Sequence, residues 1–214
     1  MPMVLLVRHG QASFGEGNYD RLSDLGRRQA ETIGRAAALR GLRQPVAAHG
    51  TLHRQRDTAR LALASADLTG EPRVDPRWNE YDHLDLVRRY AAEHEPPAPR
   101  TSREFQVLLD AALTRWVEHG AEGGWSAFAG GVTGALHELC TALEPGHDAV
   151  VFTSAGVIAA ACAGLLGGTA ETVVALNRVA VNGAITRLVV GRSGTSLLTF
   201  NEHGHLDPAD VTYR

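Results

Sequence analysis

The sequence predicts an α/β fold, a three-layer sandwich with a mostly parallel central sheet and helices on both faces. Short apolar runs that suit buried strands alternate along the chain with longer segments of helical spacing. The run at residues 4–7 is apolar throughout, as expected for a parallel strand covered on both faces. The length of 214 residues and the hydrophobic fraction of 44% are sufficient for one sizeable core.

The first part of the chain predicts alternating strands and helices. Ser23 is a suitable N-cap for the first helix, and Gly41 is suited to end it. Strands are predicted over residues 4–7 and 46–48, and helices over residues 24–40 and 53–65. Residues 71–82 are predicted to contain a strand fragment and the loop that follows it.

The middle of the chain predicts two helices over residues 84–94 and 103–119. The segment "EPPAPRTS" separates them, and its two adjacent prolines are incompatible with a continuous helix. We interpret residues 83–125 as a helical cap that leaves the core of a single domain spanning residues 1–214. Such an excursion is suited to shape the entrance to a site.

The last part of the chain predicts a return to the core. Leu136, Leu139, Cys140 and Leu143 follow the spacing of an amphipathic helix, which Pro145-Gly146 ends. A strand is then predicted over residues 149–153, and a helix of small residues over 156–166. Two neighbouring strands, joined by "GRSG", are predicted over residues 184–190 and 195–200.

Charge and composition exclude several classes of function. The formal net charge of −3 gives no electrostatic reason to expect binding to nucleic acid or to an anionic membrane. All 21 basic residues are arginine, so a phosphate-loop lysine and a Schiff-base lysine are both excluded. We expect any bound anion to be held by guanidinium groups, which match phosphate in a bidentate way.

The two cysteines, Cys140 and Cys162, lie in apolar surroundings and form no C-x-x-C motif. Reduced, buried thiols are typical of the cytosol. The N-terminal apolar run is too short for a signal peptide or a membrane span, so we expect a cytoplasmic protein that does not bind membranes. The sequence leaves the oligomeric state open, and a homodimer is the common default.

The pair Arg8-His9 directly follows the first strand. Ligands of open α/β sheets bind outside the carboxyl ends of the strands, where this pair is predicted to lie. A neutral imidazole can attack phosphorus, and an adjacent guanidinium can stabilise the phosphoryl oxygens. From the pair alone, two surface residues after a strand would be the simpler interpretation.

The longer context favours the chemical interpretation. The segments "LVRHGQAS" and "YDRLSDLGRRQA" resemble the histidine phosphatase superfamily, also called phosphoglycerate mutase-like, and the resemblance covers most of the chain. It implies a phosphoglycerate mutase-like fold in which His9 is the nucleophile and Arg8 holds phosphate. It also implies that Gln11 and Ser13 are supporting phosphate-binding residues.

Two further segments match the family. "LHRQRDTA" implies that Arg54 is the second phosphate-binding arginine, whereas Arg56 and Arg60 are expected to be solvated. "PRWNEYDHLD" implies that Glu80 is the general acid, with Asp82 as the rival. A general acid must hold a proton near neutral pH, so we expect the pKa of Glu80 to be raised.

One expected match fails. The family usually carries a second histidine in a Ser-His-Gly segment, but this chain reads Ser154-Ala155-Gly156. Ser154 and Ala155 therefore mark the expected phosphate-binding position, with one donor missing. Losing one such donor typically costs about 100- to 1,000-fold in rate, so reduced activity is expected. His83 and the pair His203 and His205 are the candidate replacements.

The resemblance implies a phosphatase that needs no cofactor and no metal and acts on a small phosphorylated substrate through a phosphohistidine. The histidines of "HGH", residues 203–205, lack a third ligand for a zinc site. Gly15 replaces an asparagine common in the mutases of the family, which favours hydrolysis. Phosphoglycerate mutase-type transfer and a non-catalytic protein that binds phosphate esters or inorganic phosphate are the alternatives.

Overall fold

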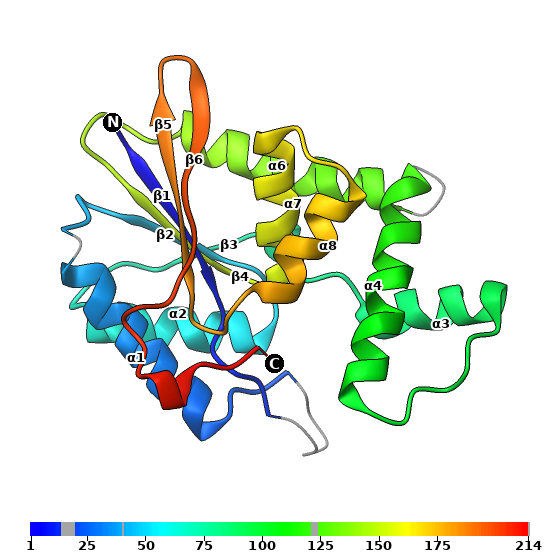
Figure 1. Cartoon of the computed structure of the whole chain (residues 1–214). Coiled ribbons are helices and arrows are strands. Elements are labelled where there is room, and N and C mark those ends of the chain that lie inside the picture. Colours follow the sequence, from blue (N-terminus) through cyan, green and yellow to red (C-terminus); the bar gives the residue numbers. More distant parts are fainter. Residues whose placement is uncertain (14–19, 40, 121–123, 214) are drawn as a thin grey trace.

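A six-stranded mixed sheet forms the centre of the computed structural model, which describes residues 1–13, 20–39, 41–120 and 124–213 (Figure 1). The strand order is β3-β2-β4-β1-β5-β6. The strands are β1 Met3–Arg8, β2 Val46–His49, β3 Arg73–Val74, β4 Ala149–Thr153, β5 Ile185–Gly191 and β6 Gly194–Glu202.

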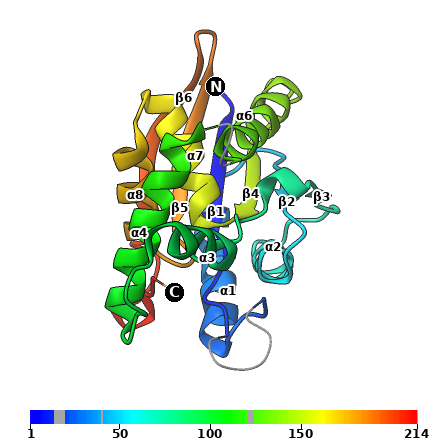
Figure 2. The same cartoon turned by 90° about the vertical axis from the view of Figure 1, so that its right-hand side faces the viewer.

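Helices cover both faces of this sheet, which confirms the predicted α/β sandwich. The helices are α1 Asp24–Leu39, α2 His53–Ser65, α3 His83–His94, α4 Ser102–Glu118, α6 Trp125–Thr141, α7 Ala155–Leu166 and α8 Ala170–Val179. Two 3₁₀ turns, η1 Pro76–Trp78 and η2 Pro208–Asp210, lie in the connecting segments. Figure 2 shows the same arrangement from the side that carries α3 and α4.

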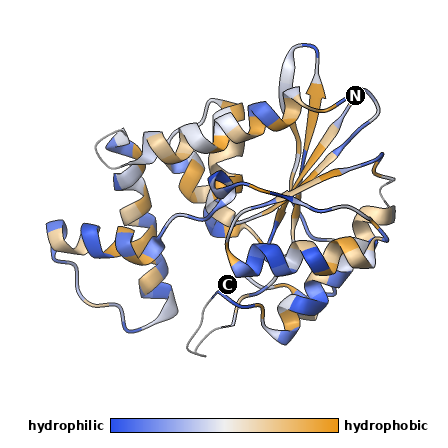
Figure 3. Cartoon of the chain, turned by 180° about the vertical axis from the view of Figure 1, so that it is seen from behind, coloured by the Kyte–Doolittle hydropathy of each residue, from blue (hydrophilic) through white to orange (hydrophobic). Residues whose placement is uncertain are grey.

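Strand β1 lies near the middle of the sheet and connects the two halves of the core. Because successive strand side chains point to opposite faces, Val4 and Leu6 pack on the side of α6 and α7, whereas Leu5 and Val7 pack on the side of α1 and α2. All four side chains are fully buried. Figure 3 shows the apolar residues concentrated in the central strands.

The sheet is parallel on one side of β1 and antiparallel on the other. β1 pairs in parallel with β4, and β2 pairs in parallel with both β4 and β3. β5 runs antiparallel to both β1 and β6. The carboxyl ends of β1, β2 and β4 therefore meet at one edge of the sheet, where Arg8, His49 and Thr153 end their strands.

The predicted elements recur with two differences. Helix α8 lies in a segment for which the sequence predicted no element, and α6 begins at Trp125, well before the predicted amphipathic stretch. Trp125 packs edge-on against Trp116 of α4, with ring centroids 5.1 Å apart. The apolar residues at the start of α6 therefore face the helical pair α3–α4, which lies beyond α8 in Figure 1.

Candidate active site

A cavity of about 560 Å³ opens at the carboxyl end of β1. Five of the predicted site residues line it: Arg8, His9, Arg54, Glu80 and Ala155. They come from the end of β1, the start of α2, the loop after η1 and the start of α7. The structure thus brings together an imidazole, two guanidinium groups and a carboxyl group from three separate parts of the chain.

The hydrogen bonds of His9 define which ring nitrogen can react. Its Nδ1 lies 2.7 Å from the carbonyl oxygen of Gly10, which can only accept, so Nδ1 carries the proton. Nε2 therefore holds the lone pair and accepts a hydrogen bond from Arg54 Nε at 3.1 Å. Burial lowers the pKa of His9 well below its ordinary value, and the charges of Arg54 and Arg8 lower it further. His9 is thus a neutral imidazole at neutral pH.

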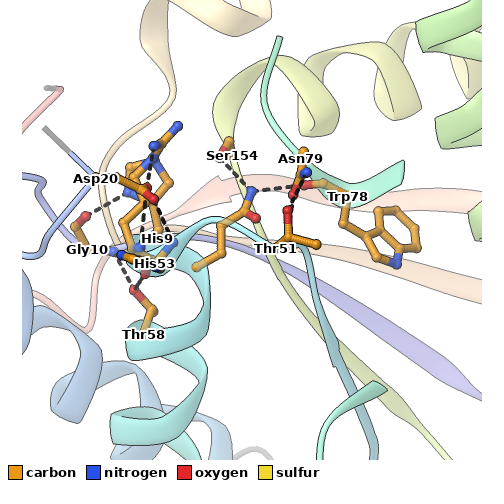
Figure 4. Close-up of polar contacts among 11 residues, drawn as sticks. His9, Gly10, Asp20, Thr51, His53, Thr58, Trp78, Asn79 and Ser154 are labelled. Atoms are coloured by element: carbon orange, nitrogen blue, oxygen red, sulfur yellow. Dashed lines mark hydrogen bonds and ion pairs between the residues drawn. The ribbon is translucent and has the colours of Figure 1, made fainter. Parts of the chain in front are cut away.

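Arg54 is held by Asp20, a residue that the sequence did not single out. Arg54 Nη1 lies 2.7 Å from Asp20 Oδ1, and Asp20 Oδ2 accepts the backbone N–H of His53 at 2.8 Å (Figure 4). Leu52 precedes α2 and provides no side-chain cap. Asp20 therefore caps the helix from a distant segment while it orients the guanidinium. The missing cap at Leu52 was the signal in the sequence that an acceptor had to come from elsewhere.

Backbone oxygens fix the guanidinium of Arg8. Its Nη1 donates to the carbonyls of Ala180, at 2.5 Å, and Tyr213, at 3.1 Å. Both partners are neutral, so these contacts orient the group without cancelling its charge.

Glu80 lies against the N-terminus of α7. Its Oε2 accepts the backbone N–H of Gly156 at 3.1 Å, and its Oε1 accepts the N–H of Tyr81 at 3.2 Å. Burial raises the pKa of Glu80, and this effect exceeds the opposing influence of these hydrogen bonds and of Arg54 and Arg8. The rival carboxylate is used differently, because Asp82 accepts the N–H of Asp85 at 2.9 Å and caps α3.

The loop that carries Glu80 is fixed by a buried network, of which Figure 4 shows the contacts of Trp78 and Ser154. The carbonyl oxygen of Trp78 accepts hydrogen bonds from Gln55 Nε2, at 2.8 Å, and from Thr153 Oγ1, at 2.7 Å. Gln55 Nε2 also donates to Ser154 Oγ at 2.9 Å. Helix α2, strand β4 and the Glu80 loop are therefore connected below the cavity.

Three expected phosphate-binding residues lie outside the cavity lining. The Ser154 side chain is fully buried and belongs to the network with Gln55. Gln11 Oε1 accepts a hydrogen bond from Ser23 Oγ at 2.9 Å, and the Ser13 N–H donates to the Arg21 carbonyl. The Gln11 side chain and the Ser13 backbone N–H therefore connect the segment after β1 to residues 21–23, and neither residue lines the cavity. Gly15 lies outside the described residues.

Ala155 is the first residue of α7 and contributes its methyl group to the cavity wall. Of the candidate replacement histidines, His83 also lines the cavity. His203 Nδ1 contacts the Asn201 carbonyl oxygen at 2.7 Å, His205 Nε2 contacts that of Gly183 at 3.0 Å, and neither lines the cavity. His83 is therefore the one candidate of the three that the fold places at the site.

Other features of the sequence lie away from this cavity. Arg56 is exposed and pairs with Asp57, as expected for a solvated arginine. Cys140 and Cys162 are free thiols, and burial raises the pKa of Cys162 to about 12. The described residues contain no cluster of three or more possible metal ligands. Within the same ranges, every helix is too short or too polar to cross a membrane.

Solved structures of phosphatases share the fold. A mycobacterial glucosyl-3-phosphoglycerate phosphatase is 24% identical, with a TM-score of 0.66 over 95% of this chain and 100% of that chain. The α-ribazole phosphatase from Shigella flexneri is 18% identical, with a TM-score of 0.59 over 94% of this chain and 96% of the other. The phosphoserine phosphatase from Entamoeba histolytica is 17% identical, with a TM-score of 0.60 over 96% and 99%.

No curated protein sequence matches this chain. The family model described as "Histidine phosphatase superfamily (branch 1)" matches residues 4–203. That range contains β1 with Arg8 and His9, the start of α2 with Arg54, the Glu80 loop and the start of α7. The chain therefore belongs to the histidine phosphatase superfamily.

Proposed function

We propose that this protein is a phosphatase that hydrolyses a phosphate monoester through a phosphohistidine intermediate on His9. The observation that carries the proposal is the state of His9: a buried, neutral imidazole whose Nε2 lies 3.1 Å from Arg54 Nε in a cavity shared with Arg8 and Glu80. Membership of the family and the fold shared with phosphatases support the same reaction class.

In the first step, the lone pair on His9 Nε2 attacks phosphorus, and the bond between phosphorus and the leaving oxygen breaks. Arg54 Nε–H turns from Nε2 to a phosphoryl oxygen, and Arg8 neutralises further charge. The carboxyl group of Glu80 gives its proton to the leaving oxygen, so that a neutral alcohol departs. Positioning and charge stabilisation dominate phosphoryl transfer, and the two fixed arginines provide both.

In the second step, water attacks the phosphohistidine. The Glu80 carboxylate takes a proton from the water as the new bond from oxygen to phosphorus forms. The bond between phosphorus and Nε2 breaks, and its electron pair returns to the imidazole. Inorganic phosphate leaves, and both His9 and Glu80 return to their starting protonation states.

Ala155 favours a second candidate function, that of a non-catalytic protein that binds phosphate esters. A methyl group offers no donor at the position where the sequence motif leads us to expect a histidine. The N-terminus of α7 partly compensates, because its partial positive charge lies at the same place. Since one missing donor costs about 100- to 1,000-fold, we expect slow turnover instead of none.

The test compares the unchanged protein with the His9→Ala and Ala155→His variants on 4-nitrophenyl phosphate. We expect turnover that His9→Ala abolishes and that Ala155→His accelerates. Binding of inorganic phosphate without His9-dependent turnover at any pH would instead establish the non-catalytic function. Interconversion of 2- and 3-phosphoglycerate would indicate a mutase.

A further inference from the structure

The cavity extends well beyond the residues assigned to phosphate. Its volume of about 560 Å³ lies within the range typical of sites for small organic ligands. Much of its lining comes from the start of α3 and from residues 99–109, which lead into and form the first half of α4. This second part of the cavity is where the leaving group of a phosphate monoester would lie.

An apolar wall, defined here as Leu84, Phe105 and Leu109, lines this second part. Leu84 is 57% exposed although it faces a cavity, so a bound ligand can remove apolar surface from water there. The ring of Phe105 packs edge-on against His83, with centroids 6.3 Å apart, which fixes the orientation of the wall. Leu109 is buried and forms the base of the wall within the helical pair.

The polar groups around this wall are largely paired with one another. Arg178 contacts Asp110 Oδ2 through Nε at 2.8 Å and Nη2 at 2.6 Å, which compensates its charge. Gln106 Nε2 donates to Asp110 Oδ1 at 2.8 Å, and Asn177 Nδ2 donates to Tyr81 Oη at 3.4 Å. Apart from Arg100, this half of the cavity therefore offers few uncommitted charges to a ligand.

We propose that the substrate is a phosphate monoester with a bulky leaving group whose body is apolar and covers Leu84 and Phe105. This inference rests on the proposed phosphatase function. A compact, charged leaving group such as serine would leave the wall in contact with water. The apolar wall thus selects the leaving group, whereas the arginines recognise the phosphate that all such substrates share.

The test uses primary alkyl phosphates, whose leaving alcohols are similar in acidity. We expect kcat/KM for cyclohexylmethyl phosphate to exceed that for ethyl phosphate and for phosphoserine by roughly tenfold or more, the gain expected from covering one large side chain. Leu84→Asn should lower the ratio of cyclohexylmethyl to ethyl phosphate by roughly tenfold. Equal kcat/KM values, or a preference for phosphoserine, would overturn the inference.

Val107→Asn is the matched control. Val107 lies on the same helix as Phe105, is 65% exposed and is absent from the cavity lining, so its substitution should leave the ratio unchanged. The affinities for cyclohexylmethyl phosphonate and ethyl phosphonate, measured by calorimetry, distinguish a failure of the proposed phosphatase function from a failure of the proposed apolar wall. Selective binding of the bulky phosphonate without turnover would refute the phosphatase and keep the apolar wall, whereas turnover with unselective binding would refute the wall.

Discussion

At the scale of single residues, a comparison of the buried His9 and His49 shows which properties of His9 come from its backbone contact and which come from the neighbouring side chains. His9 directly follows β1, and His49 is the last residue of β2. In each residue Nδ1 lies near the carbonyl oxygen of the following glycine. His9 alone of the two lines the cavity and contacts a guanidinium group. The backbone contact leaves Nε2 without a proton, and in the reaction that we propose Arg54 and Arg8 provide the environment in which Nε2 accepts a phosphoryl group.

Glu80→Gln tests the general acid. For alkyl phosphates, whose leaving group needs a proton, we expect kcat/KM to fall by about 100- to 10,000-fold. For 4-nitrophenyl phosphate, whose leaving group departs as an anion, the loss should be far smaller. Equal losses for both substrates would contradict the role of Glu80.

The pH profile gives an independent measurement. Burial raises the pKa of Glu80, so the acid form persists above the usual range of a glutamate and is lost as the pH rises through that raised value. The pKa of His9 is lowered, so the neutral nucleophile persists into acid. We expect kcat/KM for an alkyl phosphate to fall on both sides, and Glu80→Gln to remove the alkaline fall that Glu80 causes.

Asp20→Asn tests whether Asp20 positions Arg54. The substitution removes the ion pair at 2.7 Å, so the guanidinium loses its anchor next to His9. Because small displacements of a catalytic group are costly, we expect kcat to fall by roughly 10- to 100-fold. The weakened cap of α2 should lower the melting temperature by only a few degrees. Asp57→Asn, on the same helix and paired with exposed Arg56, should leave kcat unchanged. A loss in both variants would mean that α2 was merely disturbed.

The sequence identified the residues that meet in the cavity more reliably than their partners. The four residues that belong to sequence motifs of fixed local spacing all line the cavity: Arg8, His9, Arg54 and Glu80. Asp20 was missed because its contact with Arg54 depends on how two loops meet in space. The positions of Gln11, Ser13 and Ser154 depend on side-chain direction, which adjacency in the sequence does not determine.

At the scale of elements, helix α7 depends on a small residue where it meets the Glu80 loop. A Cβ atom at Gly156 would lie 2.3 Å from Glu80 Oε1 and 2.3 Å from Tyr81 Cε1. Gly156→Ala should therefore displace Glu80 and lower kcat by roughly 100-fold. Gly164→Ala, on the same helix with open space around it, should keep full activity and add stability of about 0.5–1 kcal/mol. Thermal unfolding and steady-state rates distinguish the two sites.

The predicted elements succeed where hydrophobic spacing is strong. Strands β1 and β4 are continuous apolar runs, and α1 carries Ala30, Ile33 and Ala37 on one face, so the existence of these elements was predictable. Helix α8 was missed because its short sequence, AETVVALNRV, mixes β-branched residues with helix formers. The antiparallel direction of β5 was also not predictable, since it follows from how α8 returns the chain to the sheet.

At the scale of the whole molecule, Asp148 connects distant segments at the edge of the sheet opposite the cavity. Its side chain is fully buried and accepts the N–H groups of Met3 and Arg43, both at 2.8 Å. Burial alone would raise its pKa, but the hydrogen bonds from Arg43 and Met3 outweigh it and lower the pKa. The carboxylate therefore stabilises the fold above the pKa of the unfolded residue, about 3.9.

Asp148→Asn should accordingly lower the free energy of unfolding by about 1–3 kcal/mol at neutral pH. The amide NH₂ of asparagine would face the N–H donors of Met3 or Arg43, with which it cannot form a hydrogen bond. The difference from the unchanged protein should shrink as the pH falls through the lowered pKa of Asp148, where the native carboxylate also becomes protonated. Urea unfolding between neutral pH and pH ~3 measures this dependence. Asp207→Asn, at an exposed position, should show no such effect. A difference independent of pH would contradict the role of the charge.

The complete fold brings residues from distant parts of the sequence to one cavity. Parallel strands bring Arg8 and His9 to the same edge of the sheet as the start of α7, α2 adds Arg54, and the loop after η1 adds Glu80. The start of α3 and residues 99–109 line much of the remainder of the cavity, together with Asn177 and Arg178 of α8. In the functions that we propose, Arg8, His9 and Arg54 recognise the phosphate at the edge of the sheet, whereas the apolar wall of the helical pair contacts the leaving group.

The most direct test of this account is to trap the protein during turnover and locate the phosphoryl group. The protein is mixed with a phosphate monoester, quenched in alkali within milliseconds and digested, and the peptides are analysed by mass spectrometry. We predict one acid-labile phosphoryl group on Nε2 of His9, formed and lost at rates consistent with turnover. Turnover without any phosphorylated His9 peptide, or with the label on another residue, would contradict it.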